Sequence, residues 1–274
     1  MVMSIGSGYA ASVSNRYLEK SDKNLGLAMA KLSAGRRVMS ARDDAAALAI
    51  GSRLQVEVSA QQQAYRNAGQ AGSMLRVADG GMSGVGDILQ RMKTLTVQAG
   101  SGHLSADDRR ALDTEYQGLA SEVDRIAADT DFGGTKLLDG STASVDVRVG
   151  SGTGASDEIS APLGEVSKSA LALTGTGIAS QADADAANAA VSDAIDRVQN
   201  LRAENGASQN RLDYASAAIA TSIENAEAAR SRLIDLDVAR AARDLSLLKT
   251  QQESGIYASK QANQTSRSLL NLFA

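Results

Sequence analysis

Cysteine is absent from the 274 residues, and histidine occurs only once. Without cysteine the chain cannot form a disulfide framework, use a thiol nucleophile or hold a Cys-based zinc site. Other transition-metal sites usually need several histidines, and a Ser–His–Asp triad needs one positioned histidine as its base. The single candidate, His103, follows Ser101 and Gly102 and is predicted to lie exposed in a loop. We therefore predict no catalytic residue, no metal site and no cofactor.

The remaining patterns that resemble catalytic or binding motifs are incomplete. The run Gly133-Gly134-Thr135-Lys136 lacks the GxxxxGK spacing of a phosphate-binding loop. Adjacent residues on a helix point in different directions, so the pairs Asp43-Asp44 and Asp107-Asp108 are not expected to share a proton. Helix-start or salt-bridge roles are predicted for both pairs, and the chain is not predicted to be an enzyme.

Long apolar runs are also missing. No window of about 18 apolar residues occurs, so membrane insertion is not predicted, and residues 1–10 lack the basic and apolar regions of a secretory signal peptide. The net charge of −4 is too small to indicate a nucleic-acid partner. Basic residues outnumber acidic ones in residues 1–35 and 240–274, whereas acidic residues dominate residues 141–200. This distribution indicates that the two ends of the chain share one environment.

Proline and aromatic residues are scarce. Pro162 is the only proline, so almost the whole chain is permitted to be helical. Aromatic residues make up 3% of the chain, which leaves few large side chains for the layered core of a globular domain. Small residues suit helices that pack closely side by side. We predict a mainly α protein, built as an elongated helical hairpin or coiled-coil bundle.

Apolar or small residues recur at intervals of three and four in four long stretches, as is typical of amphipathic helices. The second stretch covers about 50 residues, or roughly 75 Å of helix, and needs an antiparallel partner to bury its apolar side. The third stretch has a matching length. A shorter helix fits residues 106–128, with Ser105 as its N-cap. The four stretches run from Ala11 to Leu32, from Ala47 to Leu95, from Val191 to Leu233 and from Val238 to Leu269.

The periodicity changes in the middle of the chain. Residues 144–149 alternate polar and apolar side chains with period two, which predicts a strand, and residues 158–163 can return as a second strand. A small β-hairpin is therefore expected near 137–163, led into by turns at Gly133-Gly134 and Asp139-Gly140. Residues 164–185 are small and polar, and are predicted to form a short, variable surface loop.

Several longer motifs stand in order along the chain. LSAGRRV occupies residues 32–38 and SARDDAA residues 40–46, DRI at 124–126 precedes TDFGGTKLL at 130–138, and AARSRLI occupies 228–234. Together they resemble the signatures of bacterial flagellins, and the resemblance covers residues 1–160 and 190–274. It indicates a short, two-domain flagellin without large outer domains.

The resemblance implies a structural subunit that self-assembles into the flagellar filament for motility. Such a protein would leave the cell through the flagellar type III export apparatus and reside in the extracellular filament. Its partners would be copies of itself or sister flagellins, the export apparatus and a chaperone, and the filament cap and hook-junction proteins. A hook–filament junction protein is the alternative interpretation. A chemoreceptor-like signalling hairpin is a third, opposed by the absence of membrane spans and by the β-hairpin.

The resemblance also implies a division of the chain and candidate contact residues. Residues 1–35 and 240–274 would pair as an inner core domain, and residues 36–239 would form an outer domain. The charged residues at the junction are candidates for polar contacts between domains or subunits: Arg36, Arg37, Arg42, Asp43 and Asp44. The apolar side of the terminal helices is predicted to be covered by neighbouring subunits: Leu18, Leu25, Met29, Leu32, Leu245, Leu248, Ile256 and Leu269.

One further segment is similar to a region through which some flagellins are sensed by a vertebrate Toll-like receptor. Its candidate receptor-facing residues are Arg91, Leu95 and Glu115. Thr94 stands where those flagellins have a glutamate, so receptor recognition is not predicted.

Overall fold

The structure is a computed structural model that describes the backbone of residues 2–152 and 154–273, and the side chains of residues 9, 12–152, 154 and 156–265. The chain is 74% helical, as the composition predicts. The helices are α1 (Val2–Ala34), α2 (Ala45–Ala99), α3 (Ala106–Asp129), α4 (Gln181–Ile234) and α5 (Val238–Phe273), with one 3-10 turn at Ala155–Asp157. Two antiparallel sheets of two strands each contain β1 (Asp131–Phe132) with β2 (Thr135–Lys136), and β3 (Ser144–Arg148) with β4 (Glu158–Pro162). Among the described residues, no helix is both long and apolar enough to cross a bilayer.

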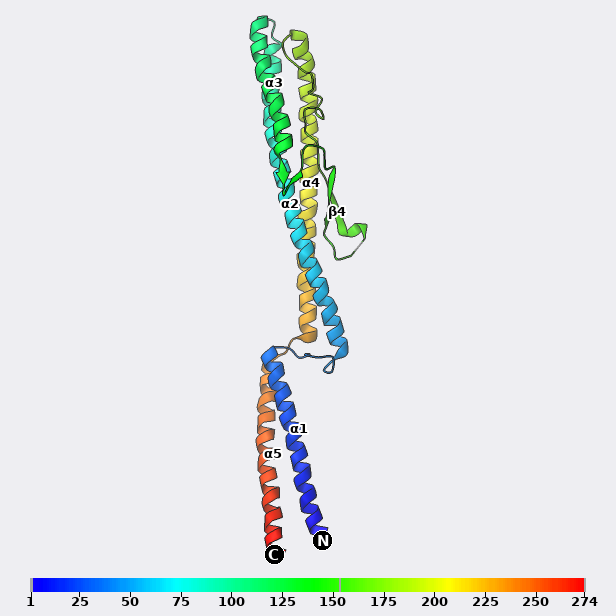
Figure 1. Ribbon diagram of the computed structural model, residues 1–274, viewed down its shortest axis with the longest axis vertical. Coiled ribbons are helices and arrows are strands. Elements are labelled where there is room, and N and C mark those ends of the chain that lie inside the picture. The colour runs from blue at the N-terminus through cyan, green and yellow to red at the C-terminus, as the bar shows by residue number, and fades with distance from the viewer. Residues whose placement is uncertain (1, 153, 274) are drawn as a thin grey trace. The chain divides into compact units, whose positions relative to one another are not determined.

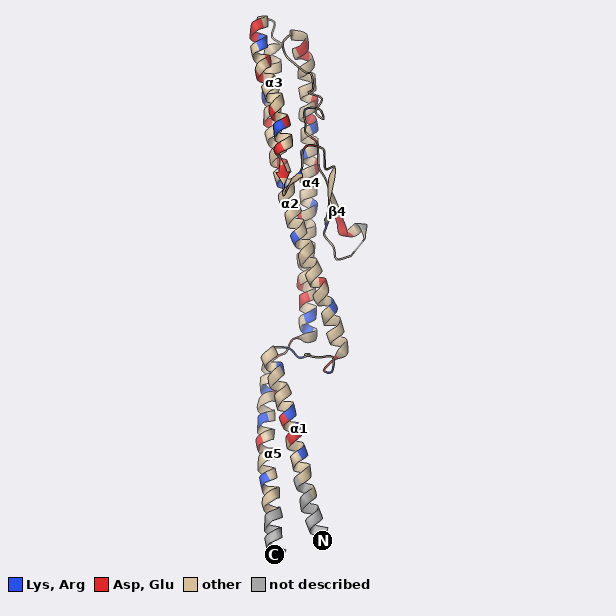
Figure 2. Ribbon diagram, viewed as in Figure 1, with Lys and Arg blue, Asp and Glu red and all other residues tan. Residues whose placement is uncertain are grey.

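The chain divides into two compact units, Met1–Val56 with Asn225–Ala274, and Glu57–Glu224. In the first unit α1 packs along α5, so the two basic ends of the chain lie together (Figures 1 and 2). The two helices run antiparallel, because Gln252 donates to Asp22 at 2.6 Å and Ser259 donates to Asn15 at 3.2 Å. The two ends, which the charge distribution places in one environment, are thus neighbours in the first unit.

In the second unit α2 and α4 are antiparallel neighbours, as their matching lengths predict. Polar contacts between them hold one register: Gln61 donates to Ser222 at 2.9 Å, and the Asn205 amide donates to the Leu75 carbonyl at 3.0 Å. Farther along α2, the Lys93 ammonium donates to the Asn188 carbonyl at 3.0 Å. Leaving a buried amide without a hydrogen-bond partner lowers the stability of the fold by about 1–3 kcal/mol. The hydrogen bond of Asn205 therefore opposes a shift of α2 along α4.

Helix α3 and the hairpin complete the core of the second unit (Figure 1). Ser105 caps α3 through a capping box with Asp108, which confirms the predicted helix start. Strand β3 pairs with β4 in the register Val145 to Ala161 and Val147 to Ile159, which confirms the predicted hairpin. The apolar side of α2 supplies much of the core, although Ile50 and Tyr65 of the predicted stretch are exposed.

Residues 164–180 differ from the surface loop that their composition predicts. The segment packs against the helices with four apolar side chains buried: Val166, Leu171, Leu173 and Ile178. Two carboxylates of α3 hold its backbone, since Lys168 N–H donates to Asp124 at 2.7 Å and Ile178 N–H donates to Asp113 at 2.8 Å. The last residues of the predicted loop already belong to α4, which begins at Gln181. The segment is therefore part of the core of the second unit.

Candidate assembly surfaces

The terminal helices α1 and α5 form a pair without a buried core. No side chain described in either helix is buried, although the two helices contact each other along their length. Leu18 Cδ1 lies 3.5 Å from the position that a Cβ on Gly255 would occupy, which is an ordinary van der Waals distance. The apolar side of each helix is thus only half covered by its partner.

The apolar contact residues that the resemblance implies are likewise only partly covered. Met29 remains 52% exposed and Ile256 38% exposed. Leu269 lies outside the residues whose side chains are described. The other predicted residues of the pair are half-buried: Leu18, Leu25, Leu32, Leu245 and Leu248. Further apolar side chains that the three-and-four spacing did not select are more exposed, including Leu27 at 58% and Leu247 at 58%.

Two connecting segments meet where α1 ends and α4 ends. Gly35 has a φ of +66°, a left-handed conformation that favours glycine, and lets the chain leave α1. Arg36 forms a β-bridge with Asp235, and the N–H of Arg37 donates to the Ile234 carbonyl at 2.7 Å. The Arg37 guanidinium also donates to the Leu233 carbonyl. Arg36 and Arg37 therefore tie the two connecting segments together within one chain.

Asp43 and Asp44 have the local roles predicted for an acid pair at a helix start. Asp43 accepts from the N–H groups of Met39 and Ser40 at 3.2 and 3.1 Å and pairs with Lys31 at 3.1 Å. The hydrogen bond from Lys31 and those from the turn lower the pKa of the Asp43 carboxyl to about 2. Asp44 accepts from the N–H of Ala47 at 2.9 Å and so caps α2. Its ion pair with Arg37, at 3.9 Å and exposed, contributes little.

Like the guanidinium of Arg36, whose bridge to Asp235 uses only the backbone, the Arg42 side chain is left free by the described residues of the subunit. It makes no hydrogen bond or ion pair with any described residue. It lines a groove of about 840 Å³ between the end of α1 and the 39–43 turn, beside the exposed Met39 and Leu27 and the paired Lys31. The groove offers apolar surface under a basic rim, which suits contact with another protein surface.

The segment compared above with a receptor-recognised region divides between surface and core. Arg91 and Glu115 form an exposed ion pair of 2.7 Å that joins α2 to α3. Leu95 is fully buried in the core, so its side chain is not on the surface of the subunit. Leu95 also belongs to the apolar residues that recur at intervals of three and four along α2. That pattern predicts a side chain in the core, which is where the structure places Leu95.

The described residues offer no cluster suited to metal binding. His103 lies exposed in the loop after α2, where its Nδ1 is 2.6 Å from the hydroxyl of Ser101. Within the described part of the chain, no three His, Cys, Asp or Glu side chains are grouped so that they could hold a metal ion. The surfaces described above offer apolar area, hydrogen-bonding groups and charges, which suit contacts with other proteins.

Comparison with known proteins gives a consistent result. Residues 5–143 match the bacterial flagellin N-terminal helical region and residues 188–273 match the bacterial flagellin C-terminal helical region. A flagellar filament 33 kDa core protein of Treponema phagedenis is 31% identical over 98% of this chain and 99% of its own length. The crystal structure of Bacillus cereus flagellin matches with a TM-score of 0.51 and 30% identity over 56% of this chain and 87% of that one. A putative flagellar hook-associated protein from Vibrio parahaemolyticus matches with a TM-score of 0.60, covering 70% of this chain and all of that one, but its 19% identity shows the fold alone.

Proposed function

Because the chain belongs to the bacterial flagellin family, we propose that the pair of α1 and α5 is the main surface through which its subunits assemble. The protein is a structural subunit that self-assembles into the flagellar filament.

One observation supports the choice of surface: the terminal pair buries no described side chain, whereas the second unit has a continuous buried core. Half-covered apolar side chains gain about 25 cal/mol for each Å² that a neighbour removes from water. Folding of the terminal pair and binding of neighbours would then be coupled, so the pair is stable only in the polymer. Repeated head-to-tail contacts of this kind do not close and generate a filament.

The assembly domains are proposed to divide near the ends of α1 and α4. Residues 1–35 and 240–274 would form the inner domain and residues 36–239 the outer one. The connecting segments support this division, because Arg36 and Asp235 are bridged next to the ends of α1 and α4. Arg42 is the charged residue here that we assign to a contact between subunits, because it lines the groove beside Met39 and has no partner among the described residues, whereas Arg37, Asp43 and Asp44 are hydrogen-bonded or ion-paired within the chain.

We extend the proposal to the other partners that the family implies. Export through the flagellar type III apparatus, with a chaperone, would require a chain that threads unfolded, and terminal helices without buried side chains oppose unfolding least. The filament cap and hook-junction proteins would contact the same terminal pairs at the two ends of the filament. The protein would act as a structural subunit, in keeping with the structural family to which it belongs.

Replacing Leu25 or Leu248 with Asp tests the assignment. Each carboxylate would have to be buried between subunits, at a cost of several kcal/mol, so polymerisation should be lost. The matched control is Leu25→Met, which keeps an apolar side chain of similar volume and should polymerise. Purified protein is seeded with sheared filaments and viewed by negative-stain electron microscopy, and the thermal transition of the monomer checks that the second unit stays folded. Normal filaments from Leu25→Asp would refute the assignment.

The same seeding experiment separates the filament subunit from the hook–filament junction protein. A filament subunit adds without limit and lengthens the seeds, whereas a junction protein adds only a short terminal layer. We expect long filaments, because the relative that aligns over 98% of this chain is a filament core protein.

A further inference from the structure

Asn205 and Gly206 form the only Asn-Gly pair in the chain. Such a pair is chemically labile in an unfolded chain, because the main-chain nitrogen of a glycine is not shielded by a side chain and can attack the preceding carboxamide. Both residues lie well inside α4, in the second unit. The fold therefore places the most labile asparagine of the sequence in the middle of a long helix.

The side chain of Asn205 is held at both of its polar atoms. It is 3% exposed, and its Nδ2 donates to the Leu75 carbonyl of α2 at 3.0 Å. Its Oδ1 accepts from Nε2 of Gln209, one turn farther along α4, at 3.2 Å. The carboxamide is thus fixed away from its own main chain, and its burial keeps water from it.

The main chain beside Asn205 is held as well. Inside an α-helix such as α4 the N–H of Gly206 donates to the carbonyl four residues earlier. Closing a ring from that nitrogen to Cγ of Asn205 requires the ψ of Asn205 to leave the helical range, and it breaks this hydrogen bond. Nothing lies within 4 Å of a Cβ built on Gly206, so packing does not require a glycine here.

We propose that Asn205 is a site of non-enzymatic deamidation that reacts only when α4 unfolds. The main-chain nitrogen of Gly206 forms a bond to Cγ of Asn205, and the side-chain nitrogen leaves as ammonia with the proton of the N–H. Water then opens the resulting succinimide at either carbonyl, which gives aspartate or isoaspartate at this position. The site therefore marks a chain according to the time that it has spent unfolded.

Neither product fits the place of Asn205. An ionised aspartate has no N–H for the Leu75 carbonyl, and it brings a negative charge to a buried position. An isoaspartate adds one carbon to the main chain and so interrupts the hydrogen bonds of α4. A chain that is modified while unfolded would therefore lose a contact that holds α2 and α4 in register.

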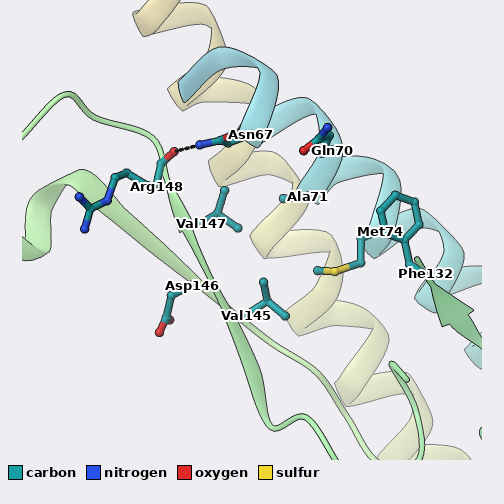
Figure 3. A pocket seen from close by; sticks show the side chains of 9 residues that line it. All are labelled: Asn67, Gln70, Ala71, Met74, Phe132, Val145, Asp146, Val147 and Arg148. Carbon is teal, nitrogen blue, oxygen red and sulfur yellow. Dashed lines mark hydrogen bonds between the residues drawn. The ribbon is translucent and has the colours of Figure 1, made fainter. Parts of the chain in front are cut away.

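Two other asparagines serve as internal controls. Asn67 of α2 also donates its amide to a main-chain carbonyl of another element, that of Arg148 in β3, at 3.3 Å (Figure 3). Asn210 is exposed on the same helix as Asn205. Alanine follows Asn67 and arginine follows Asn210, and their side chains shield the main-chain nitrogen. Both asparagines should react much more slowly than Asn205 in the unfolded chain.

Peptide mass spectrometry of the full-length chain tests the site. The protein is kept at one pH and temperature, either in native buffer or in concentrated guanidinium chloride, and is then digested with trypsin. Cleavage after Arg202 and Arg211 releases residues 203–211, which contain both Asn205 and Asn210. Deamidation at Asn205 should be at least about a hundredfold slower in native buffer, because it waits for a core helix to open. Equal rates in both buffers, or no reaction at Asn205 in the denaturant, would overturn the proposal.

Three variants separate the reaction from its consequence. Gly206→Ala should slow deamidation severalfold in guanidinium chloride and keep the fold, because the added methyl group meets open space. Asn205→Asp should lower the urea concentration at the midpoint of unfolding, whereas the exposed control Asn210→Asp should leave it nearly unchanged. A midpoint for Asn205→Asp equal to that of the natural chain would refute the predicted loss of register. None of these measurements depends on filament assembly, so their failure would leave the proposed function intact.

Discussion

At the scale of single residues, two neighbouring glycines of α2 have different roles. A Cβ on Gly81 would lie 2.7 Å from Leu138 Cδ1 and 2.7 Å from Thr130 Oγ1, whereas nothing lies within 4 Å of a Cβ on Gly80. Gly81 thus allows the segment after α3 to pack directly on the helix, and Gly80 only lowers helix propensity. The sequence by itself does not distinguish them.

This difference predicts opposite effects on stability. Gly81→Ala should lower the free energy of unfolding by about 1–3 kcal/mol, because the added methyl group overpacks the contact with Leu138. Gly80→Ala, the matched control, should raise it by about 0.5–1 kcal/mol, because alanine is the better helix former. Urea unfolding of the monomer measures both, and equal effects would contradict the close approach at Gly81.

The turn after α1 predicts a pH dependence. The pKa of Asp43 is lowered from 3.8 to about 2, so the stability that its carboxylate adds is fully present above pH 3.8 and is lost as the pH falls toward 2. Lys31→Gln should move the pKa of Asp43 back toward 3.8, because it removes the largest cause of the shift. Lys23→Gln, which breaks a pair with Glu19 instead, should leave it unchanged. Solid-state carboxyl NMR of the filament, in which α1 is expected to be folded, reports this titration, and an unshifted Asp43 in the natural chain would disprove the pairing.

At the scale of elements, residues 164–180 show how a stretch without periodicity becomes ordered. Their apolar side chains are separated by serine, glycine and threonine at irregular intervals, so neither helix nor strand is indicated. Their order comes from α3, whose Asp113, Tyr116 and Asp124 accept or form hydrogen bonds with the segment. These partners are more than forty residues away in sequence, as the separations of 65, 60 and 44 show.

The packing of this segment can be measured with two substitutions. Ile178→Ala should destabilise the monomer by about 2–5 kcal/mol, because it empties a fully buried site. Thr174→Ala, on an exposed side chain of the same segment, should change stability by no more than about 0.5 kcal/mol. The midpoint of urea unfolding reports both values. Two equally small effects would mean that the segment is a surface loop.

At the scale of the whole molecule, the two units differ in how their helices are stabilised. The second unit buries apolar side chains from α2, α3, α4 and the hairpin in one cluster. The terminal pair buries none of its described side chains, and helices that lack packing are marginal in water. The subunit therefore combines a part that folds by itself with a part that depends on neighbours.

Hydrogen exchange should reveal this contrast. In the monomer, amides of α1 and α5 should exchange rapidly while those of α2 near Leu75 and Leu89 are protected. In the filament the terminal helices should become protected as well, because neighbouring subunits cover them. Mass spectrometry of peptides from monomer and filament gives the comparison. Terminal helices already protected in the monomer would show that the pair is stable alone, and the proposed coupling of folding to assembly would then be wrong.

The sequence by itself determined which segments are helices and where the hairpin lies. These properties follow from local periodicity, caps and composition, as the capped start of α3 at Ser105 and the alternation in β3 show. It also carried the motifs that identify the family. The contact surfaces were only partly predictable: the spacing selected Leu25 and Leu248, but not the exposed Leu27.

The tertiary structure alone decided the burial of residues 164–180, the separate roles of Gly80 and Gly81, and the freedom of the Arg42 side chain while the neighbouring Asp43 is paired with Lys31. The physical reason is the same in each case. The burial, steric crowding and pairing of a side chain depend on residues that the fold brings close from distant parts of the sequence. The local spacing of residue types does not indicate which residues these are.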